Sequence, residues 1–183
     1  MSREFDDRYG AQNRDILETR TVDELRSVAG GRVIGDGIYR VLDDDAVGMI
    51  GPSIDTMFPD RAGALDPFAT DWLGRVFATR ADRVGTVAIL EPGTAEVLDT
   101  GIDLAAFHRT EIVEQADAAL AVDFYGAWRD GGGAVPAADQ CVGYRRPLFL
   151  GGGDDVENLE LGDMDVYWSV MAQTVEQIRR RTA

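Results

Sequence analysis

The chain has 183 residues, which suits one domain or a tightly joined pair. Its formal net charge is −15, and its arginines are scattered apart from short runs at residues 145–146 and 179–181. Such a surface repels phosphate backbones, which argues against direct binding of nucleic acid. All 18 basic residues are arginine, so a Walker loop and Schiff-base chemistry are both excluded, because each needs a lysine.

The acidity admits two interpretations. A strongly acidic protein can cover a basic partner, for instance by occupying the surface where that partner would hold DNA. Alternatively, the charge serves solubility or adaptation to high salt. The charge alone does not decide between them.

The first ten residues, MSREFDDRYG, carry charges where a secretory signal would need an apolar stretch, and Cys141 is the only cysteine. The longest apolar runs, at residues 86–90 and 118–122, are far shorter than the ~20 residues that span a bilayer. We therefore expect a cytoplasmic protein without a membrane segment.

The first hundred residues predict strands with two helices. Thr21 and Glu24 have the spacing of a capping box, which predicts a short helix ending near residues 30–31. A turn at residues 35–37 precedes a strand at 38–42. Residues 45–58 are apolar enough for a helix, with Pro52 at a boundary or in its first turn. Residues 71–80 and 83–100 predict strands, the latter a hairpin that turns at residues 92–94.

From residue 103 the pattern becomes helical, with a break near residues 114–117. A loop with three glycines follows at 131–133, and residues 147–150 (PLFL) predict a buried strand. The last helix is the clearest element: it begins near Asp163, and its apolar residues predict that a face centred on Tyr167 packs on the sheet. The expected fold class is α+β, a mainly antiparallel sheet with helices packed on it and a long C-terminal helix.

Motifs for catalysis and metal binding are scarce. His108 is the sole histidine, and Cys141 is expected to pack beside Tyr144 rather than act as a nucleophile. Ser53 lies in a segment without the second glycine of a nucleophile elbow, and no stretch matches G-x-G-x-x-G. The acidic residues between 154 and 165 lack the spacing of an EF-hand, so we interpret them as solvated carboxylates and helix caps.

Several motifs, in this order, resemble a bacterial family. They are D-W-L-G-R at 71–75 with Phe77, the E-P-G-T hairpin, the Phe107–His108 helix, C-V-G-Y-R-R-P-L-F-L-G-G, V-E-N-L-E, and D-V-Y-W with Gln173. The family they resemble is the type VI secretion system immunity proteins of the Tdi type, once a domain of unknown function. The resemblance covers most of residues 14–178. It implies a GAD-like region at 14–100 and a Tdi-like region at 101–183. Because the chain shows no internal repeat and no low-complexity linker, we expect one compact unit over 1–183.

The resemblance implies a cytoplasmic immunity protein that binds a cognate DNase toxin and blocks it, with no catalysis, cofactor or metal of its own. Such domains also occur without a toxin partner. A module that binds a small molecule near Trp72, Arg75 and Tyr144 is therefore the alternative, and an enzyme relying on carboxylates alone is the weakest hypothesis.

Six residues are candidates for contact with a partner or ligand, because aromatic residues and arginine dominate binding sites: Trp72, Arg75, Tyr144, Arg145, Asn158 and Trp168. The tryptophans could equally be core residues. Arg75 is framed by apolar residues and therefore needs an acidic partner. Asn158 is placed to hydrogen-bond the turned backbone of the glycine-rich loop before the last helix.

Overall fold

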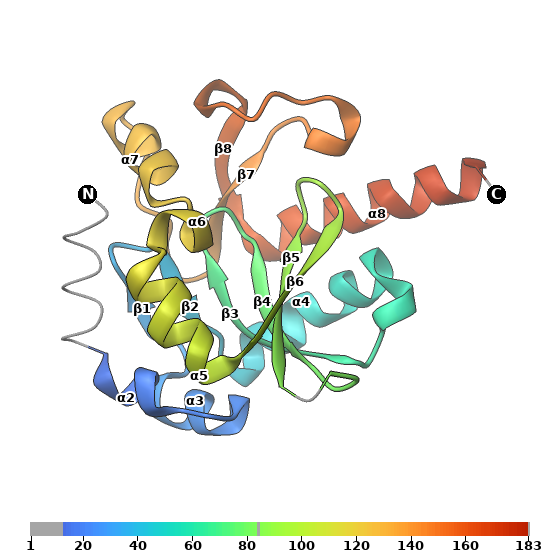
Figure 1. Cartoon of the computed structure of the whole chain (residues 1–183). Helices are drawn as coiled ribbons and strands as arrows, with labels where there is room; N and C mark the ends of the chain where they lie inside the picture. The colour runs from blue at the N-terminus through green and yellow to red at the C-terminus, as the bar shows by residue number, and fades with distance from the viewer. Residues whose placement is uncertain (1–12, 84, 183) are drawn as a thin grey trace.

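The computed structural model describes residues 13–83 and 85–182 (Figure 1). The strands are β1 (Val33–Ile34), β2 (Tyr39–Val41), β3 (Leu65–Asp71), β4 (Val76–Arg80), β5 (Thr86–Glu91), β6 (Glu96–Asp103), β7 (Gln140–Tyr144) and β8 (Leu159–Asp163). The α-helices are α2 (Arg14–Glu18), α3 (Val22–Ala29), α4 (Asp44–Met57), α5 (Leu104–Ala106), α6 (Ala116–Leu120), α7 (Val122–Asp130) and α8 (Met164–Thr182). Short 3-10 segments occupy Pro59–Arg61, Leu148–Leu150 and Val156–Asn158, and a π-helix occupies Phe107–Ile112.

Strands β1 to β6 form one antiparallel sheet in which neighbours in sequence are neighbours in space. Strands β7 and β8 form a separate antiparallel pair, joined by the long loop of residues 145–158. This arrangement, with α8 at the end of the chain, confirms the predicted α+β class.

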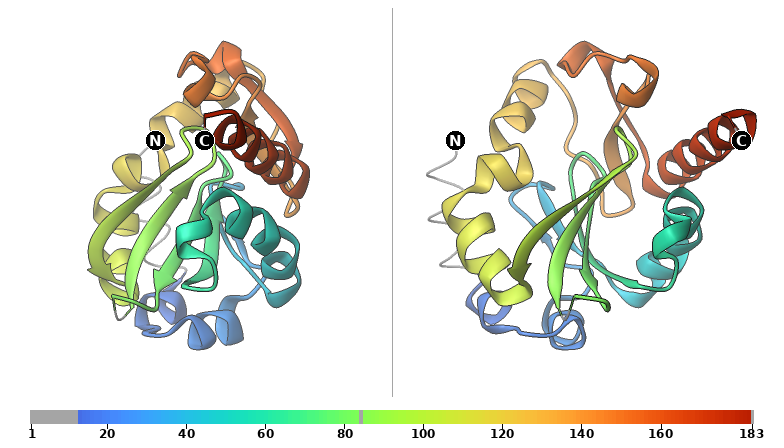
Figure 2. Two further views of the ribbon diagram at one scale, coloured as in Figure 1. Left: turned by 90° about the vertical axis from the view of Figure 1, so that its right-hand side faces the viewer. Right: turned by 45° about the vertical axis from the view of Figure 1, so that its right-hand side comes forward.

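Helices cover both faces of the large sheet, α5 to α7 on one side and α4 and α8 on the other (Figure 2). Strand β4 shows why: Phe77 belongs to the core under α5 to α7, whereas Val76 and Ala78 belong to the core under α4 and α8. Since successive side chains of a strand point to opposite faces, one strand supplies both cores. Each core also draws residues from both sides of residue 100, which supports the proposal of one compact unit.

Several local predictions are confirmed. The Thr21 hydroxyl accepts a hydrogen bond from the Glu24 N–H at 3.2 Å, so α3 has the predicted N-cap. The Glu24 carboxylate reaches back to the Arg20 N–H at 2.9 Å, one residue before the Thr21 N–H of a standard capping box. The hairpin of β5 and β6 turns where expected, and the helical segment after residue 103 is interrupted at Gln115.

Two predicted strands are wrong. Residues 71–80 are a turn followed by a strand: β3 ends at Asp71, the chain reverses through Gly74 at φ +74°, and β4 begins at Val76. Residues 147–150 form a 3-10 turn with Leu150 41% exposed, not a buried strand. Pro147 has no N–H for a strand ladder, and the Gly151 N–H closes the turn on the Leu148 carbonyl at 2.9 Å.

Two helix details also differ from the prediction. Helix α4 continues through Pro52, because Pro52 and Gly48 are exposed and water can reach the Gly48 carbonyl that proline leaves without a donor. The buried face of α8 is centred on Trp168, with Met171 and Val175, and Tyr167 lies at its edge. Val170, another apolar residue of α8, is 53% exposed because α8 packs chiefly against α4 rather than flat on the large sheet.

None of the helices in the described part of the chain is both long enough and apolar enough to cross a membrane.

Candidate functional site

The D-W-L-G-R motif forms the tight turn between β3 and β4. The Asp71 backbone N–H donates to the Arg75 carbonyl at 3.1 Å, and the Gly74 N–H donates to the Asp71 carbonyl at 3.1 Å. The Asp71 carboxylate accepts the Arg75 backbone N–H at 3.0 Å. An aspartate that closes a turn in this way also holds its own carboxylate in place beside the Arg75 side chain.

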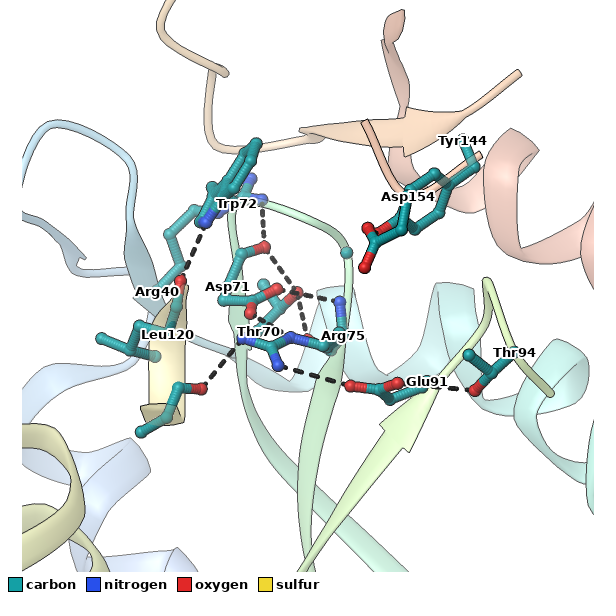
Figure 3. A network of polar contacts seen from close by, with 12 residues as sticks. Arg40, Thr70, Asp71, Trp72, Arg75, Glu91, Thr94, Leu120, Tyr144 and Asp154 are labelled. Carbon is teal, nitrogen blue, oxygen red and sulfur yellow. Dashed lines mark hydrogen bonds and ion pairs between the residues drawn. The ribbon is translucent and has the colours of Figure 1, made fainter. Parts of the chain in front are cut away.

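Arg75 is the centre of a partly buried ion network (Figure 3). Its Nε donates to Asp71 Oδ2 at 2.6 Å and its Nη1 to Glu91 Oε1 at 3.3 Å, while its Nη2 donates to the Ala119 carbonyl at 2.9 Å. The side chains of Asp71 and Arg75 are 0% and 13% exposed. The sequence predicted an acidic partner for Arg75, and the structure provides two, Asp71 and Glu91.

Burial governs the ionisation of this network. It raises the pKa of Asp71, against the opposing effect of the Arg75 guanidinium. Burial also disfavours the charge on Arg75, but the carboxylates of Asp71 and Glu91 more than offset this, so the pKa of Arg75 lies above its ordinary value.

Both candidate tryptophans are core residues with 0% exposure. The indole N–H of Trp72 donates to the Leu120 carbonyl at 2.9 Å, and its ring packs against Phe124 and Tyr125. The indole N–H of Trp168 donates to the Gly74 carbonyl at 2.9 Å. Trp72 thus ties the D-W-L-G-R turn to α6, and Trp168 ties it to α8. Neither side chain reaches the surface.

A cavity of about 200 Å³ opens beside Arg75. The residues that give it chemical character are Arg75, Glu91, Thr94, Phe124, Tyr144 and Asp154. The Tyr144 hydroxyl donates to Asp154 Oδ1 at 2.6 Å, and burial, followed by this carboxylate, raises the pKa of Tyr144. The structure therefore brings two of the six predicted residues, Arg75 and Tyr144, to the same cavity.

The remaining two candidates lie on the β7–β8 hairpin. Arg145 is exposed and faces Glu160, with 3.5 Å between Nε and Oε2. Asn158 accepts the Arg146 N–H at 3.0 Å and donates to the carbonyls of Arg146 and Gly153 at 2.9 and 2.8 Å. The predicted structural role of Asn158 is confirmed, because these bonds hold the loop 145–158 closed.

Tyr144 and Arg145 also border a second hollow, a groove of about 270 Å³ between the β7–β8 hairpin and α8. Its apolar lining includes Leu161, Val166 and Val170, two of which are more than half exposed.

Nucleophilic and metal chemistry find little support in the described residues. Cys141 is fully buried, and burial raises its pKa to about 12, so the reactive thiolate is suppressed. Burial lowers the pKa of His108 to about 4, against an opposing interaction with the Leu104 carbonyl, and its Nε2 lies 2.8 Å from the Tyr39 hydroxyl. Within residues 13–83 and 85–182, no three His, Cys, Asp or Glu side chains converge as metal ligands would.

The sequence did not single out Glu91, Asp154 or Asp71 as site residues. Glu91 opens the E-P-G-T turn and Asp71 opens D-W-L-G-R, so both stood within quoted motifs. Asp154 was interpreted as a solvated loop carboxylate. A residue in the first position of a turn motif is a usable signal, because such positions place a carboxylate at the end of a strand.

Comparison with known proteins gives one family and one fold. Residues 106–175 match the family described as T6SS immunity protein Tdi1, C-terminal, which confirms the predicted resemblance for this part of the chain. The GAD-like assignment of residues 14–100 remains a prediction. A comparison with curated protein sequences gave no significant match.

Among solved structures, the crystal structure of Atu4351 from Agrobacterium tumefaciens is similar, with a TM-score of 0.58. The similarity covers 94% of this chain and 81% of that chain at 14% sequence identity. At this identity the two proteins share a fold, and nothing further follows about their sites.

Proposed function

We propose that this chain is a cytoplasmic immunity protein of a type VI secretion system, which binds a cognate DNase toxin and blocks it by occlusion without catalysis of its own. The observation that carries the proposal is the match of residues 106–175 to the immunity family. This region contributes α6, α7, β7, β8 and most of α8, and so the lining of the groove and one wall of the cavity.

The charge of the protein supports occlusion of a nuclease. A DNase must attract phosphates through exposed arginine and lysine side chains. A protein with a net charge of −15 is attracted to the same surface, and long-range attraction speeds the encounter.

The first test is to purify the tagged protein from its host and identify stoichiometric partners by mass spectrometry. A partner qualifies only if it degrades DNA alone and loses that activity when an equimolar amount of this protein is added. A protein that elutes without a nuclease, or that leaves the nuclease active, would refute the proposal.

Charge variants then test the electrostatic part. Reversal of exposed acids, such as Glu160→Lys and Asp163→Lys at the groove, is expected to slow association with the toxin and to flatten its dependence on salt. Glu18→Lys on α2, remote in sequence and also exposed, is the matched control. Equal association rates for all three variants would contradict electrostatic steering at this surface.

The cavity beside Arg75 favours one alternative, a module that binds a small molecule. Under this alternative a metabolite raises the melting temperature of the purified protein, and Tyr144→Phe weakens the effect. An unchanged melting temperature across a broad metabolite panel would remove the alternative.

A further inference from the structure

The cavity is enclosed by four separate parts of the chain, one of which is the β3–β4 turn with Leu73 and Arg75. The β5–β6 turn supplies Glu91 and Thr94, α7 supplies Phe124, and the β7–β8 hairpin with its loop supplies Tyr144 and Asp154. The loop is fastened to the turn, since the Phe149 N–H donates to the Gly93 carbonyl at 3.2 Å. The walls are therefore held in place by hydrogen bonds in the protein as it stands.

The cavity is acidic despite the presence of Arg75. All three nitrogens of Arg75 already donate, and its shortest contact, at 2.6 Å, neutralises Asp71. Glu91 receives only longer contacts, 3.3 Å from Arg75 and 3.4 Å from the Thr94 hydroxyl. Asp154 accepts from the neutral Tyr144 hydroxyl. Among the lining residues one guanidinium, already paired with Asp71, thus stands against the two carboxylates of Glu91 and Asp154, which leaves negative charge in excess.

Arg40, the other arginine beside Asp71, does not remove this excess. Its Nη1 donates to the carbonyls of Ala137 and Ala138 at 2.7 and 2.8 Å, and its Nη2 lies 3.4 Å from the Asp71 backbone carbonyl. Its contacts are therefore with the backbone on the opposite side of Asp71 from the cavity, which Arg40 does not line.

Two aromatic rings complete the walls. Phe124 and Tyr144 both line the cavity, and aromatic faces attract cations. The Tyr144 ring is fixed by its bond to Asp154 and by close packing on Gly93, where an added Cβ would come within 2.7 Å of the ring. Carboxylates beside a held aromatic ring are the chemistry that recognises organic cations.

We propose that this cavity binds an alkylammonium or guanidinium group. At about 200 Å³ it is smaller than the roughly 300–1,000 Å³ pockets that hold drug-sized ligands, and it suits one long side chain or a small amine. An anion would meet the excess carboxylates, and an apolar group would strip water from Glu91 and Asp154 without replacing it. A cation supplies the missing charge and hydrogen-bond donors together.

The occupant of the cavity in the complex follows only if the chain is an immunity protein, so this step rests on the proposed function. A basic side chain of the toxin would enter the cavity, and nucleases carry such side chains to hold DNA phosphates. Occlusion would then include the withdrawal of a cation from the DNA-binding surface. A free amine is the other source of the same chemistry.

The first arm of the test uses the purified protein alone. Calorimetric titration with N-acetyl-L-arginine amide is compared with N-acetyl-L-citrulline amide, which has the same shape without the charge. We expect the arginine compound to bind at least about tenfold more tightly. Glu91→Gln and Asp154→Asn should each weaken it about tenfold, whereas Asp130→Asn, an exposed acid at the end of α7, should not. Equal binding of the two compounds, or no binding of either, would overturn the proposal.

The second arm assigns the source and uses the toxin identified by co-purification. Loss of at least about tenfold in toxin affinity in the Glu91→Gln/Asp154→Asn variant supports a toxin side chain as the occupant. Unchanged toxin affinity in a variant that no longer binds the arginine compound supports a free amine. If wild-type protein inhibits no toxin, the proposed function fails, and the first arm still decides the cavity on its own.

Discussion

Removal of the Arg75 side chain tests the physical account of the buried network. In an Arg75→Ala variant the fully buried Asp71 carboxylate keeps the Arg75 backbone N–H at 3.0 Å but loses the guanidinium at 2.6 Å. Loss of one partner from a buried pair costs about 3–5 kcal/mol. Because one hydrogen bond remains, we expect a loss near the lower end, about 3 kcal/mol at neutral pH.

The loss of stability should depend on pH, because protonation of Asp71 removes its unpaired buried charge. Burial already raises the pKa of Asp71, and removal of the opposing guanidinium raises it further. In the unfolded chain Asp71 has an ordinary pKa of about 3.9. Keeping Asp71 protonated in the folded variant therefore costs about 4 kcal/mol at pH 7 and about 1.5 kcal/mol at pH 5. These figures are upper limits on the charge penalty. The variant is therefore expected to lose less stability, relative to wild type, at pH 5 than at pH 7.

Urea-induced unfolding, followed by circular dichroism at both pH values, measures these differences. Arg145→Ala is the control, since Arg145 is 59% exposed in its pair with Glu160 and such surface pairs contribute about 0–1 kcal/mol. In an Asp71→Asn background the Arg75→Ala change should cost less and show no such dependence on pH. A loss below about 1 kcal/mol, or an equal loss at both pH values, would refute the reasoning.

Three further changes probe other parts of the structure. Because burial lowers the pKa of His108 from 6.5 to about 4, this histidine is protonated only in the unfolded chain between these two pH values. As the pH falls through this window, the unfolding free energy of wild type should drop by up to about 3 kcal/mol relative to that of His108→Phe. An equal pH dependence of the unfolding free energy in the two proteins would contradict this. Asn158→Ala should raise amide exchange in the loop 145–158 about tenfold, and unchanged exchange would exclude a clamp. Gly143→Ala places a Cβ within 2.4 Å of the Tyr167 ring and should cost about 1–3 kcal/mol in thermal unfolding, whereas Gly162→Ala on the paired strand meets nothing within 4 Å; equal costs would show that the ring moves aside.

The sequence predicted those elements whose cause is local. The cap that the Thr21 hydroxyl places on the Glu24 N–H acts within four residues, and the β5–β6 turn at residues 92–94 is specified by its own proline and glycine. The long apolar periodicity of α8 likewise predicts a helix whatever it packs against.

Errors arose where distant contacts decide the outcome. The face of α8 depends on its packing against α4, more than a hundred residues earlier, so Trp168 replaced Tyr167 as the central buried residue. The apolar run at 147–150 suggested a strand, but the neighbouring strand β8 pairs with Gln140–Tyr144 and not with this run. No pattern within these short segments carries that information.

For the candidate site, the sequence predicted that Arg75 has an acidic partner but not which residues provide it. An arginine among apolar residues requires a carboxylate, which is why Arg75 was selected. That the partners are Asp71 and Glu91 follows from the adjacency of β3, β4 and β5, and the chain offers 33 acids to choose from. Asp154 joined the site only because the loop 145–158 folds back over the β5–β6 turn.

The D-W-L-G-R turn connects the sheet to the region that matches the immunity family. Trp72 bonds Leu120 through its indole and Val142 through its carbonyl, and Arg75 bonds Ala119. Substitutions in the turn will therefore disturb the sheet, the helices and the β7–β8 hairpin together, so a loss of binding there would not locate a binding surface. Asp154 borders the cavity without joining these cross-links, and Glu91 touches them only through its 3.3 Å contact with Arg75. Changes at these two acids can therefore separate recognition from folding.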